Sequence, residues 1–154
     1  MILPAIDTDI EDLRLLFIEY QTAFGFSPCF QNFQEEIDTL PGKYASPKGA
    51  LLIARDLQGK AIGMVALRPT DVADTCEMKR LYVTPAARGT RLGQQLLEAI
   101  IHAARARNYR HMRLDTFSGK MDRAIAMYRA AGFKDIPAWY DDPLPDIICL
   151  SKDL

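Results

Sequence analysis

The sequence contains few of the residues that cross-link small proteins or bind metal ions. Its 154 residues include three cysteines, two histidines and one tryptophan. The cysteines are odd in number, lie far apart and form no CxxC pair, so the sequence indicates neither a disulfide framework nor a zinc site. The two histidines are nine positions apart and make no metal-binding pair. We therefore expect no bound metal and a reducing, cytoplasmic compartment.

Long apolar runs and targeting signals are also lacking. Nowhere do about 18 apolar residues follow one another, so we expect neither a membrane span nor a membrane partner. The N-terminal "MILPAIDTDIEDL" has neither the basic start nor the apolar run of a signal peptide. No internal repeat or long linker divides the chain. With 49% hydrophobic residues, the chain can bury one core, and we expect a single domain over residues 1–154.

The net charge is small, −1, but the charges are segregated along the chain. Residues 1–40 contain eight acidic residues and one basic residue, whereas residues 79–113 contain eight basic residues and one acidic residue. This pattern is typical either of two solvated helix faces or of a bipolar site that takes an anion at one end and a cation at the other. Nucleic acid is not an expected partner, because no aromatic stacking platform is interleaved with the basic residues.

Hydrophobic periodicity predicts one α/β domain with a mixed sheet. The first predicted helix begins after Asp7 or Thr8. Three further helices are predicted over residues 30–40, 91–107 and 120–131. The predicted strands span residues 2–5, 49–56, 60–69, 75–83, 111–116, 132–136 and 146–152. The second and third strands are expected to form a hairpin with Asp56 and Gly59 in its turn, and Asn108 is expected to end the helix 91–107 in a left-handed conformation. The strand, helix and strand over residues 77–116 are expected to form a parallel crossover.

The stretch "VTPAARGTRLGQQLL", residues 83–97, follows a strand with two arginines and two glycines and then begins a helix at once. The first amides of a helix lack partners and attract an anion. Gly89 and Gly93 allow a ligand to approach the backbone closely, and Arg88 and Arg91 add charge that suits phosphate. The pattern matches neither the P-loop nor the dinucleotide-binding motif. It indicates either a phosphate cradle or a glycine-rich turn with surface arginines.

The run from "EMKRLYVTPAARGTRLGQQLL" through "LDT" to "AIAMYRAAGF" resembles the GCN5-related N-acetyltransferase (GNAT) family. The resemblance covers about residues 50–136. It implies an α/β (α+β) fold in which helices flank a mixed, mostly antiparallel central sheet that is splayed at its central parallel strand pair. It also implies acetyl-CoA as cosubstrate, with the pantetheine arm in the opening between those two strands.

By this resemblance, the strand end "LYV" binds the pantetheine arm through its backbone, and the loop "RGTRLG" holds the pyrophosphate. The implied residues are Leu81, Tyr82, Val83, Arg88, Gly89, Thr90, Arg91, Leu92 and Gly93.

Two positions depart from the family pattern. The family usually has glycine in place of Arg91, so either the backbone keeps a negative φ there or the cradle is reshaped. An asparagine that often precedes the helix tyrosine by seven residues is replaced here by Met121. Its hydrogen bond to the cofactor is lost or is supplied by Thr116 or Ser118.

The implied reaction is attack of a primary amine on the thioester. Tyr128 matches the family's helix tyrosine and is the expected proton donor to the thiolate, although its spacing also fits a core residue. Glu77 matches a catalytic glutamate of some members and is expected to act as base through a water. The alternative is an exposed glutamate paired with Lys79 or Arg80. Strand alternation predicts the following side chains on the face of Glu77: Lys79, Leu81 and Val83. It predicts these on the other face: Cys76, Met78, Arg80 and Tyr82.

The family builds its acceptor site from the first two helices and the loop before the last strand. Both regions are acidic here, the loop through Asp141, Asp142 and Asp146. We therefore expect a small, cationic amine acceptor, with Trp139 and Tyr140 contacting it. Four phenylalanines are expected in the core or in a lid between the first two helices, where some of them can line the acceptor site: Phe24, Phe26, Phe30 and Phe33.

The resemblance also bears on oligomeric state and on the alternative function. A homodimer through the last strands is common in the family. A non-catalytic acyl-CoA sensor is the alternative function, and the presence of Tyr128 and Glu77 disfavours it.

Overall fold

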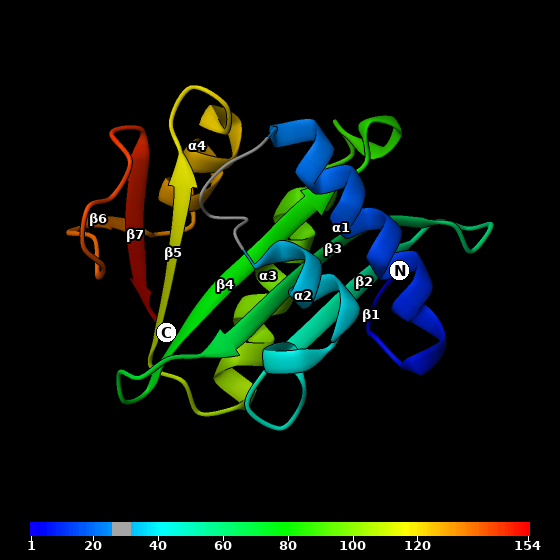
Figure 1. Cartoon of the computed structure of the whole chain (residues 1–154), viewed down its shortest axis with the longest axis horizontal. Helices are drawn as coiled ribbons and strands as arrows, with labels where there is room; N and C mark the ends of the chain where they lie inside the picture. The colour runs from blue at the N-terminus through cyan, green and yellow to red at the C-terminus, as the bar shows by residue number, and fades with distance from the viewer. Residues whose placement is uncertain (26–31) are drawn as a thin grey trace.

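Seven strands form one mixed sheet in the computed structural model, which describes residues 1–25 and 32–154. The strand order is β1-β2-β3-β4-β5-β7-β6, and β4 and β5 are the parallel pair (Figure 1). The strands span Ile2–Pro4 (β1), Ala50–Arg55 (β2), Ala61–Pro69 (β3), Thr75–Val83 (β4), His111–Phe117 (β5), Lys134–Ile136 (β6) and Ile147–Asp153 (β7). The predicted mixed, mostly antiparallel sheet is confirmed.

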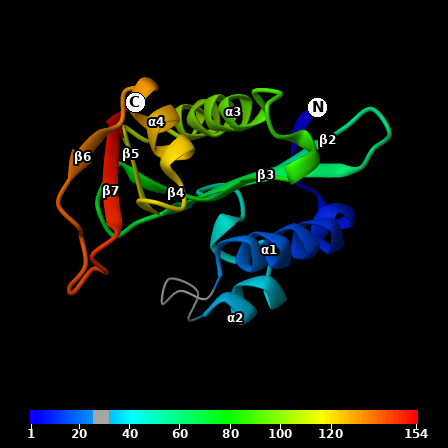
Figure 2. The ribbon, with the colours of Figure 1, turned by 90° about the horizontal axis from the view of Figure 1, so that it is seen from above.

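Helices cover both faces of this sheet. They span Ile10–Phe24 (α1), Phe33–Asp38 (α2), Leu92–Ala106 (α3) and Asp122–Ala130 (α4), with short 3-10 turns at Asp7–Asp9 (η1), Gly42–Tyr44 (η3) and Pro85–Ala87 (η4). Figure 2 shows α3 and α4 on one face of the sheet and α1 and α2 on the other. The apolar stripe of α3, including Leu96 and Ile100, packs on one face, and Leu13 and Phe17 of α1 pack on the other. The sheet therefore separates two apolar layers.

Short polar residues and glycine set the ends of several elements. Asp56 accepts two backbone hydrogen bonds of 2.9 Å in the β2–β3 turn, as expected for this hairpin. Asn108 follows α3 with a φ of 64°, which confirms the predicted left-handed stop. The start of α1 differs from the prediction, because η1 precedes it and Asp9, not Asp7 or Thr8, stands at its N-cap.

Strand β4 contains a bulge at Arg80, whose φ is 60°. The register against β3 shifts at this point, between Met64 and Ala66. An extra residue on one strand moves every later side chain to the opposite face. Leu81 and Val83 accordingly pack against the α3 layer.

The alternation predicted for β4 is therefore wrong beyond the bulge. Leu81 and Val83 share the α3 face with Met78 instead of the face of Glu77. Arg80 lies on the α1–α2 face, where its guanidinium carbon is 5.1 Å from the centre of the Phe33 ring. The prediction failed because a strict period of two assumes an unbroken ladder.

Strands β4 and β5 separate soon after they begin. Their parallel pairing joins residues 75–77 to residues 111–113 and goes no further, although the strands continue to Val83 and Phe117. Beyond Glu77, β4 has no strand partner on the β5 side within the described parts of the chain. The predicted splay is thus confirmed, and it leaves backbone N–H and C=O groups of β4 available to a ligand (Figure 1).

No helix in residues 1–25 and 32–154 is long and apolar enough to cross a membrane. Cys76 and Cys149 are buried free thiols. Cys29, Phe26 and Phe30 lie outside the described residues.

Candidate active site

The separation of β4 and β5 contains a small cavity of about 80 Å³, which we call the interstrand cavity. Its walls come from α1, β4, β5 and α4. Three residues assigned from the sequence line it, namely Leu81, Thr116 and Tyr128. The other wall residues are Tyr20, Phe24, Met78, Lys79, Arg80, Asp115, Phe117, Met121 and Ala124.

The side chains of Tyr82 and Val83 point away from this cavity. The Tyr82 hydroxyl donates a 2.9 Å hydrogen bond to Glu19 of α1, and burial raises the pKa of Tyr82 to about 12. Val83 packs against the α3 layer. Both residues can therefore contact a ligand in the splay through their backbone groups.

The turn between β4 and α3 has the backbone shape of an anion cradle. Gly89 and Arg91 both have positive φ angles, 83° and 64°, a conformation that helps neighbouring amides to converge. No side chain caps the first turn of α3. The Thr90 hydroxyl instead donates a 2.6 Å hydrogen bond to the carbonyl oxygen of Ala87. The first N–H groups of α3 are left for water or for a ligand.

The two arginines of this turn differ in their surroundings. Arg91 stands at the N-cap of α3 with φ 64° and ψ 12°, so the alternative of a negative φ is wrong. An L side chain in this region costs about 1–2 kcal/mol. The Arg88 side chain folds back, because its Nε donates to the carbonyl oxygen of Val83 at 3.3 Å.

Gly93 lies in the first turn of α3 and is not required by internal packing. A Cβ there would lie 3.8 Å from Met127 Sδ and 3.9 Å from Val83 Cγ2, which are ordinary contact distances. A ligand that lies against the helix start would require the glycine. The neighbouring Leu92 side chain is buried in the core, so Leu92 can contribute only its backbone N–H.

Tyr128 is buried on α4, with its ring centre 5.9 Å from that of Phe133. Its hydroxyl makes no hydrogen bond to the described residues. Burial raises the pKa of Tyr128 far above its ordinary value, and the nearby Tyr20 adds to this effect. The phenol therefore stays protonated at neutral pH and can donate a proton into the interstrand cavity, which it lines.

Glu77 is 4% exposed and lies where the splay begins. Arg68 of β3 donates to Glu77 Oε2 from Nε at 3.2 Å and from Nη2 at 3.1 Å. Lys79 Nζ lies 3.6 Å from Glu77 Oε1 and 3.6 Å from Asp115 Oδ1. The expected alternative of an exposed glutamate is wrong, and so is a pairing with Arg80, whereas the pairing with Lys79 is present. Lys79 thus connects Glu77 to a carboxylate of the interstrand cavity.

Of the two hydroxyls considered as replacements for the family's asparagine, one lies in the interstrand cavity. The Thr116 hydroxyl is 3.0 Å from Met121 Sδ, and both residues line the cavity. The Ser118 hydroxyl donates to the carbonyl oxygen of Asp146 at 3.3 Å and is not part of the wall.

Cys76 lies in the same strand but on the α3 face, opposite Glu77, as expected. Burial raises the pKa of the Cys76 thiol to about 12. The thiol is therefore neutral at physiological pH and is not a nucleophile.

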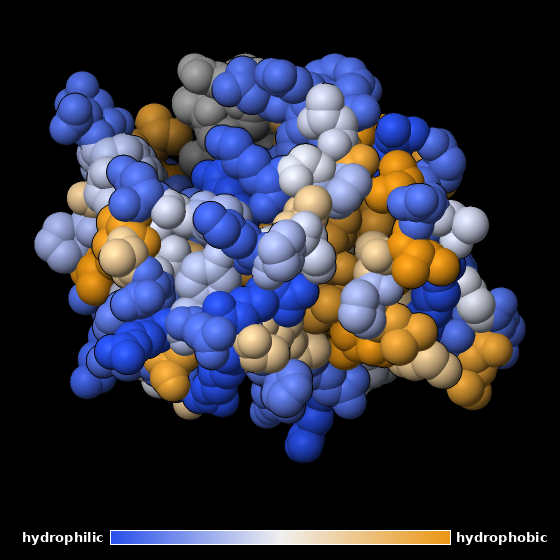
Figure 3. Space-filling model, turned by 90° about the horizontal axis from the view of Figure 1, so that it is seen from below, coloured by the Kyte–Doolittle hydropathy of each residue, from blue (hydrophilic) through white to orange (hydrophobic). Residues whose placement is uncertain are grey.

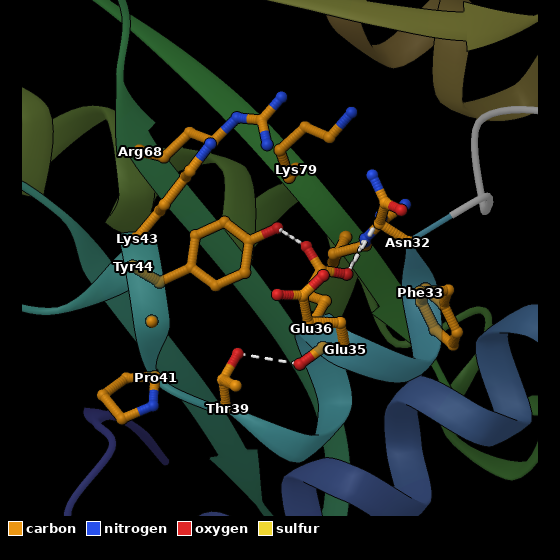
Figure 4. Close-up of a pocket in the computed structure, with 12 residues that line it drawn as sticks. Asn32, Phe33, Glu35, Glu36, Thr39, Pro41, Lys43, Tyr44, Arg68 and Lys79 are labelled. Atoms are coloured by element: carbon orange, nitrogen blue, oxygen red, sulfur yellow. Dashed lines mark hydrogen bonds and ion pairs between the residues drawn. The ribbon is translucent and has the colours of Figure 1, made fainter.

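A second cavity, of about 430 Å³, lies between α2, η3 and strands β3 and β4, and we call it the α2 cavity. Figure 4 shows the Tyr44 hydroxyl in its wall pointing at the Glu36 carboxylate, to which it donates a hydrogen bond. Glu36 Oε2 also pairs with Arg80 Nη2 at 3.0 Å. Lys79 and Arg80 line both this cavity and the interstrand cavity, so the two spaces adjoin.

The loop between β6 and β7 was expected to contribute aspartates and two aromatic side chains to the acceptor site. None of its aspartates, in residues 141–146, lines the interstrand or the α2 cavity. The Trp139 ring centre lies 4.3 Å from the guanidinium carbon of Arg113. The Tyr140 hydroxyl donates to Asp115 Oδ2 at 3.1 Å. Both aromatic residues are therefore engaged with residues of β5.

Comparisons with known proteins agree on one family. The family model described as "Acetyltransferase (GNAT) family" matches residues 11–133. An uncharacterized N-acetyltransferase of Schizosaccharomyces pombe is 37% identical over 146 residues, which cover 95% of this chain and 89% of the relative. The chain belongs to the GNAT acetyltransferase family.

Solved acetyltransferase structures share the fold of this GNAT protein. One from Streptococcus agalactiae has a TM-score of 0.81 and 27% identity, covering 100% of this chain and 98% of that chain. The PaiA N-acetyltransferase from Thermoplasma acidophilum, in complex with coenzyme A, has a TM-score of 0.76 and 18% identity, covering 100% and 98%. As a GNAT member, the chain is an acetyl-CoA-dependent N-acetyltransferase.

Several charged residues in the cavity walls of this GNAT protein were not identified as site residues from the sequence. Arg68 lies opposite Glu77 because the β3–β4 hairpin pairs them, and counting outward from the turn would have found this pair. Asp115 sits in the quoted "LDT" but carries no signal of its own. Lys43 comes from η3, and no spacing in the sequence relates it to β4.

The left-handed backbone at Arg91 makes a testable prediction. We expect Arg91→Gly to be more stable than Arg91→Ala by about 1 kcal/mol, because both variants remove the guanidinium but only glycine adopts a positive φ freely. Urea denaturation of the two variants measures the difference. Equal midpoints would show that residue 91 is not held in the left-handed region.

Proposed function

We propose that this GNAT protein transfers the acetyl group of acetyl-CoA to the primary amine of a small molecule, and that residues 1–154 act as one domain. One observation carries the proposal: an unpaired edge of β4 leads directly to an uncapped start of α3. A strand edge suits the amides of an extended arm, and a helix start suits a diphosphate.

The proposed roles in binding follow from these positions. Backbone groups of Leu81, Tyr82 and Val83 bind the pantetheine arm. The turn over residues 88–93 binds the pyrophosphate through its amides and through the two arginines. Thr116 lies beside the arm. We assign no role to Ser118, because its hydroxyl is engaged by a backbone carbonyl.

Bound acetyl-CoA supplies an activated acetyl group. The neutral amine of the acceptor attacks the thioester carbonyl, so that a C–N bond forms and the C–S bond breaks. Tyr128 gives its phenol proton to the departing sulfur, and its raised pKa keeps that proton on the phenol at neutral pH. The raised pKa of the Cys76 thiol supports direct transfer over an acetylated cysteine.

Glu77 is the proposed base, which takes the amine proton through a water. The two hydrogen bonds from Arg68 engage Oε2, so Oε1, beside Lys79, is the oxygen that receives the proton. Asp115 is the comparison residue, since Lys79 contacts both carboxylates.

The α2 cavity adjoins the interstrand cavity, and its volume of about 430 Å³ supports a small acceptor. The cationic charge expected for that acceptor finds support in one wall residue of the α2 cavity, Glu35, which makes no ion pair with the described residues. Glu36 and Glu77 are each paired with basic residues, and the aspartates of residues 141–146 lie elsewhere.

The proposed function is tested by calorimetry with coenzyme A, followed by a free-thiol release assay with acetyl-CoA and a library of small amines. We expect measurable binding and amine-dependent thiol release. Binding without turnover on any amine would favour the sensor alternative, and no binding would contradict the assignment.

Gly93→Ala separates ligand binding from folding. We expect at least about tenfold weaker binding of coenzyme A, because the added methyl group overpacks the contact with the ligand. Stability should stay equal or rise by up to about 1 kcal/mol, because alanine is the better helix former. Calorimetry and thermal denaturation measure the two effects. The control Gln94→Ala, one residue along, should bind normally, and normal binding by Gly93→Ala would refute the contact.

Tyr128→Phe tests the proton donor. We expect kcat to fall about 10²-fold while the Kd for coenzyme A stays unchanged. Tyr109→Phe, which removes a hydroxyl that bonds to the Lys48 carbonyl, serves as the control.

The raised pKa of Tyr128 also fixes a pH dependence. The phenol keeps its proton until the pH passes that raised value, so kcat should not decline between about pH 7 and about pH 9.5 through loss of this proton. A pH–rate profile that falls in this window for the native enzyme but not for Tyr128→Phe would contradict the raised pKa, because it would show that the phenol loses its proton there.

Glu77→Gln tests the base, with Asp115→Asn as the matched variant. We expect Glu77→Gln to lower kcat/KM about 10²-fold near neutral pH, with partial recovery at higher pH where more of the acceptor amine is neutral. Asp115→Asn should lower kcat/KM by less than Glu77→Gln does, and its pH–rate profile should match that of the native enzyme. A larger loss of kcat/KM in Asp115→Asn than in Glu77→Gln would assign the role of base to Asp115.

A further inference from the structure

A third cavity, of about 370 Å³, lies at the β3–β4 hairpin, and we call it the hairpin cavity. Lys43 and Arg68 line both this cavity and the α2 cavity, so the two spaces adjoin. Glu77 and Arg113 complete its charged wall, together with Asp71. In the view from below, hydrophilic residues cover the left and centre of the molecular surface (Figure 3).

Two acids in the walls of these cavities, Glu36 and Glu77, are already paired with basic groups. Glu36 is bonded to Arg80, and Glu77 is bonded to Arg68 and contacts Lys79. A carboxylate with two cationic neighbours has little attraction left for a further cation.

Two basic residues of the hairpin cavity are not neutralised in this way. Lys43 makes no ion pair with any residue that the structure describes. Within the same described ranges, Arg113 Nε is buried without a hydrogen-bond partner. The nearest carboxylate to Arg113 is Asp71, at 3.9 Å, and the Asp71 side chain is 93% exposed. Contact with the Trp139 ring holds the guanidinium in place.

We propose that the acceptor carries a carboxylate near its primary amine, as an amino acid does, and that Lys43 and Arg113 bind this carboxylate. The proposal rests on the proposed acetyl transfer and names its substrate class. Because Glu77 lines the same cavity, the amine can lie at the proposed base while the carboxylate reaches the two cations.

The guanidinium of Arg113 favours a carboxylate for a physical reason. Arg113 lines the hairpin cavity, and the carboxylate nearest to its guanidinium is the exposed Asp71 at 3.9 Å, so the guanidinium keeps much of its charge for a ligand. The planar guanidinium also matches the planar carboxylate. A cationic acceptor would be repelled by both Lys43 and Arg113.

The experiment compares matched acceptors in the acetyl-CoA thiol-release assay: amino acids, their carboxamides and the corresponding decarboxylated amines. We expect kcat/KM to be at least about tenfold higher for amino acids. The comparison is stringent, because the amine of a carboxamide resembles a peptide N-terminus, with a pKa near 7.7–8.0, and is mostly neutral at about pH 8.5.

Two variants assign the preference to the cavity. Lys43→Glu and Arg113→Gln should each lower the ratio of amino acid to carboxamide turnover by about tenfold, chiefly through KM. Lys60→Glu, which changes an exposed lysine of the β2–β3 turn, should leave the ratio unchanged. Thermal denaturation checks that the variants fold.

The outcomes distinguish the two proposals. Equal or better use of carboxamides and simple amines by the native protein overturns the carboxylate inference and leaves acetyl transfer intact. A preference for amino acids that survives both cavity variants also overturns it. No turnover on any amine, with coenzyme A bound, contradicts the proposed function and this inference together.

Discussion

The unpaired edge of β4 beyond Glu77 is the constraint on which the site depends. A strand inside a sheet satisfies its backbone groups on both sides, and each group left unsatisfied in a buried place costs about 1–3 kcal/mol. Here the pairing with β5 stops after three residues, while β3 still holds the other edge. A ligand with its own amides can complete the ladder, which is why the opening can persist in a folded protein.

Two strained residues border this opening. Arg80 and Arg91 both hold positive φ angles that arginine rarely adopts, and such strain concentrates at functional sites. The bulge at Arg80 turns Lys79 and Arg80 toward the same side of the sheet, where both line two adjoining cavities. The left-handed turn at Arg91 brings the chain into α3 without a capping side chain. The strained backbone at Arg80 therefore shapes the two cavities, and the strained backbone at Arg91 shapes the anion cradle, at a cost in stability.

Local chemistry made much of the fold predictable. The period of apolar residues located the helices and strands, and Asp56 and Asn108 marked a hairpin turn and a helix end. The family resemblance added the splay. The glycines of the anion cradle could also be identified from the sequence, because they lie where a helix is predicted to begin. The packing around Gly93 agrees, since no neighbouring atom requires a glycine there.

What escaped prediction depends on tertiary register. A bulge shows no residue signal, because arginine favours negative φ and nothing in "EMKRLYV" forbids an unbroken strand. Arg68 was not identified as the partner of Glu77, because the two residues meet only through the register of the β3–β4 pair. Counts of charge along the chain could not show that Glu36 would be paired with Arg80, or that Arg113 Nε would be buried without a hydrogen-bond partner among the described residues.

The most direct test of the central claim is hydrogen–deuterium exchange of the backbone amides with and without coenzyme A. The account predicts that binding slows exchange in two separate segments, residues 81–83 of β4 and residues 91–94 at the start of α3, while the β2–β3 hairpin is unchanged. Binding that protects neither segment would contradict it.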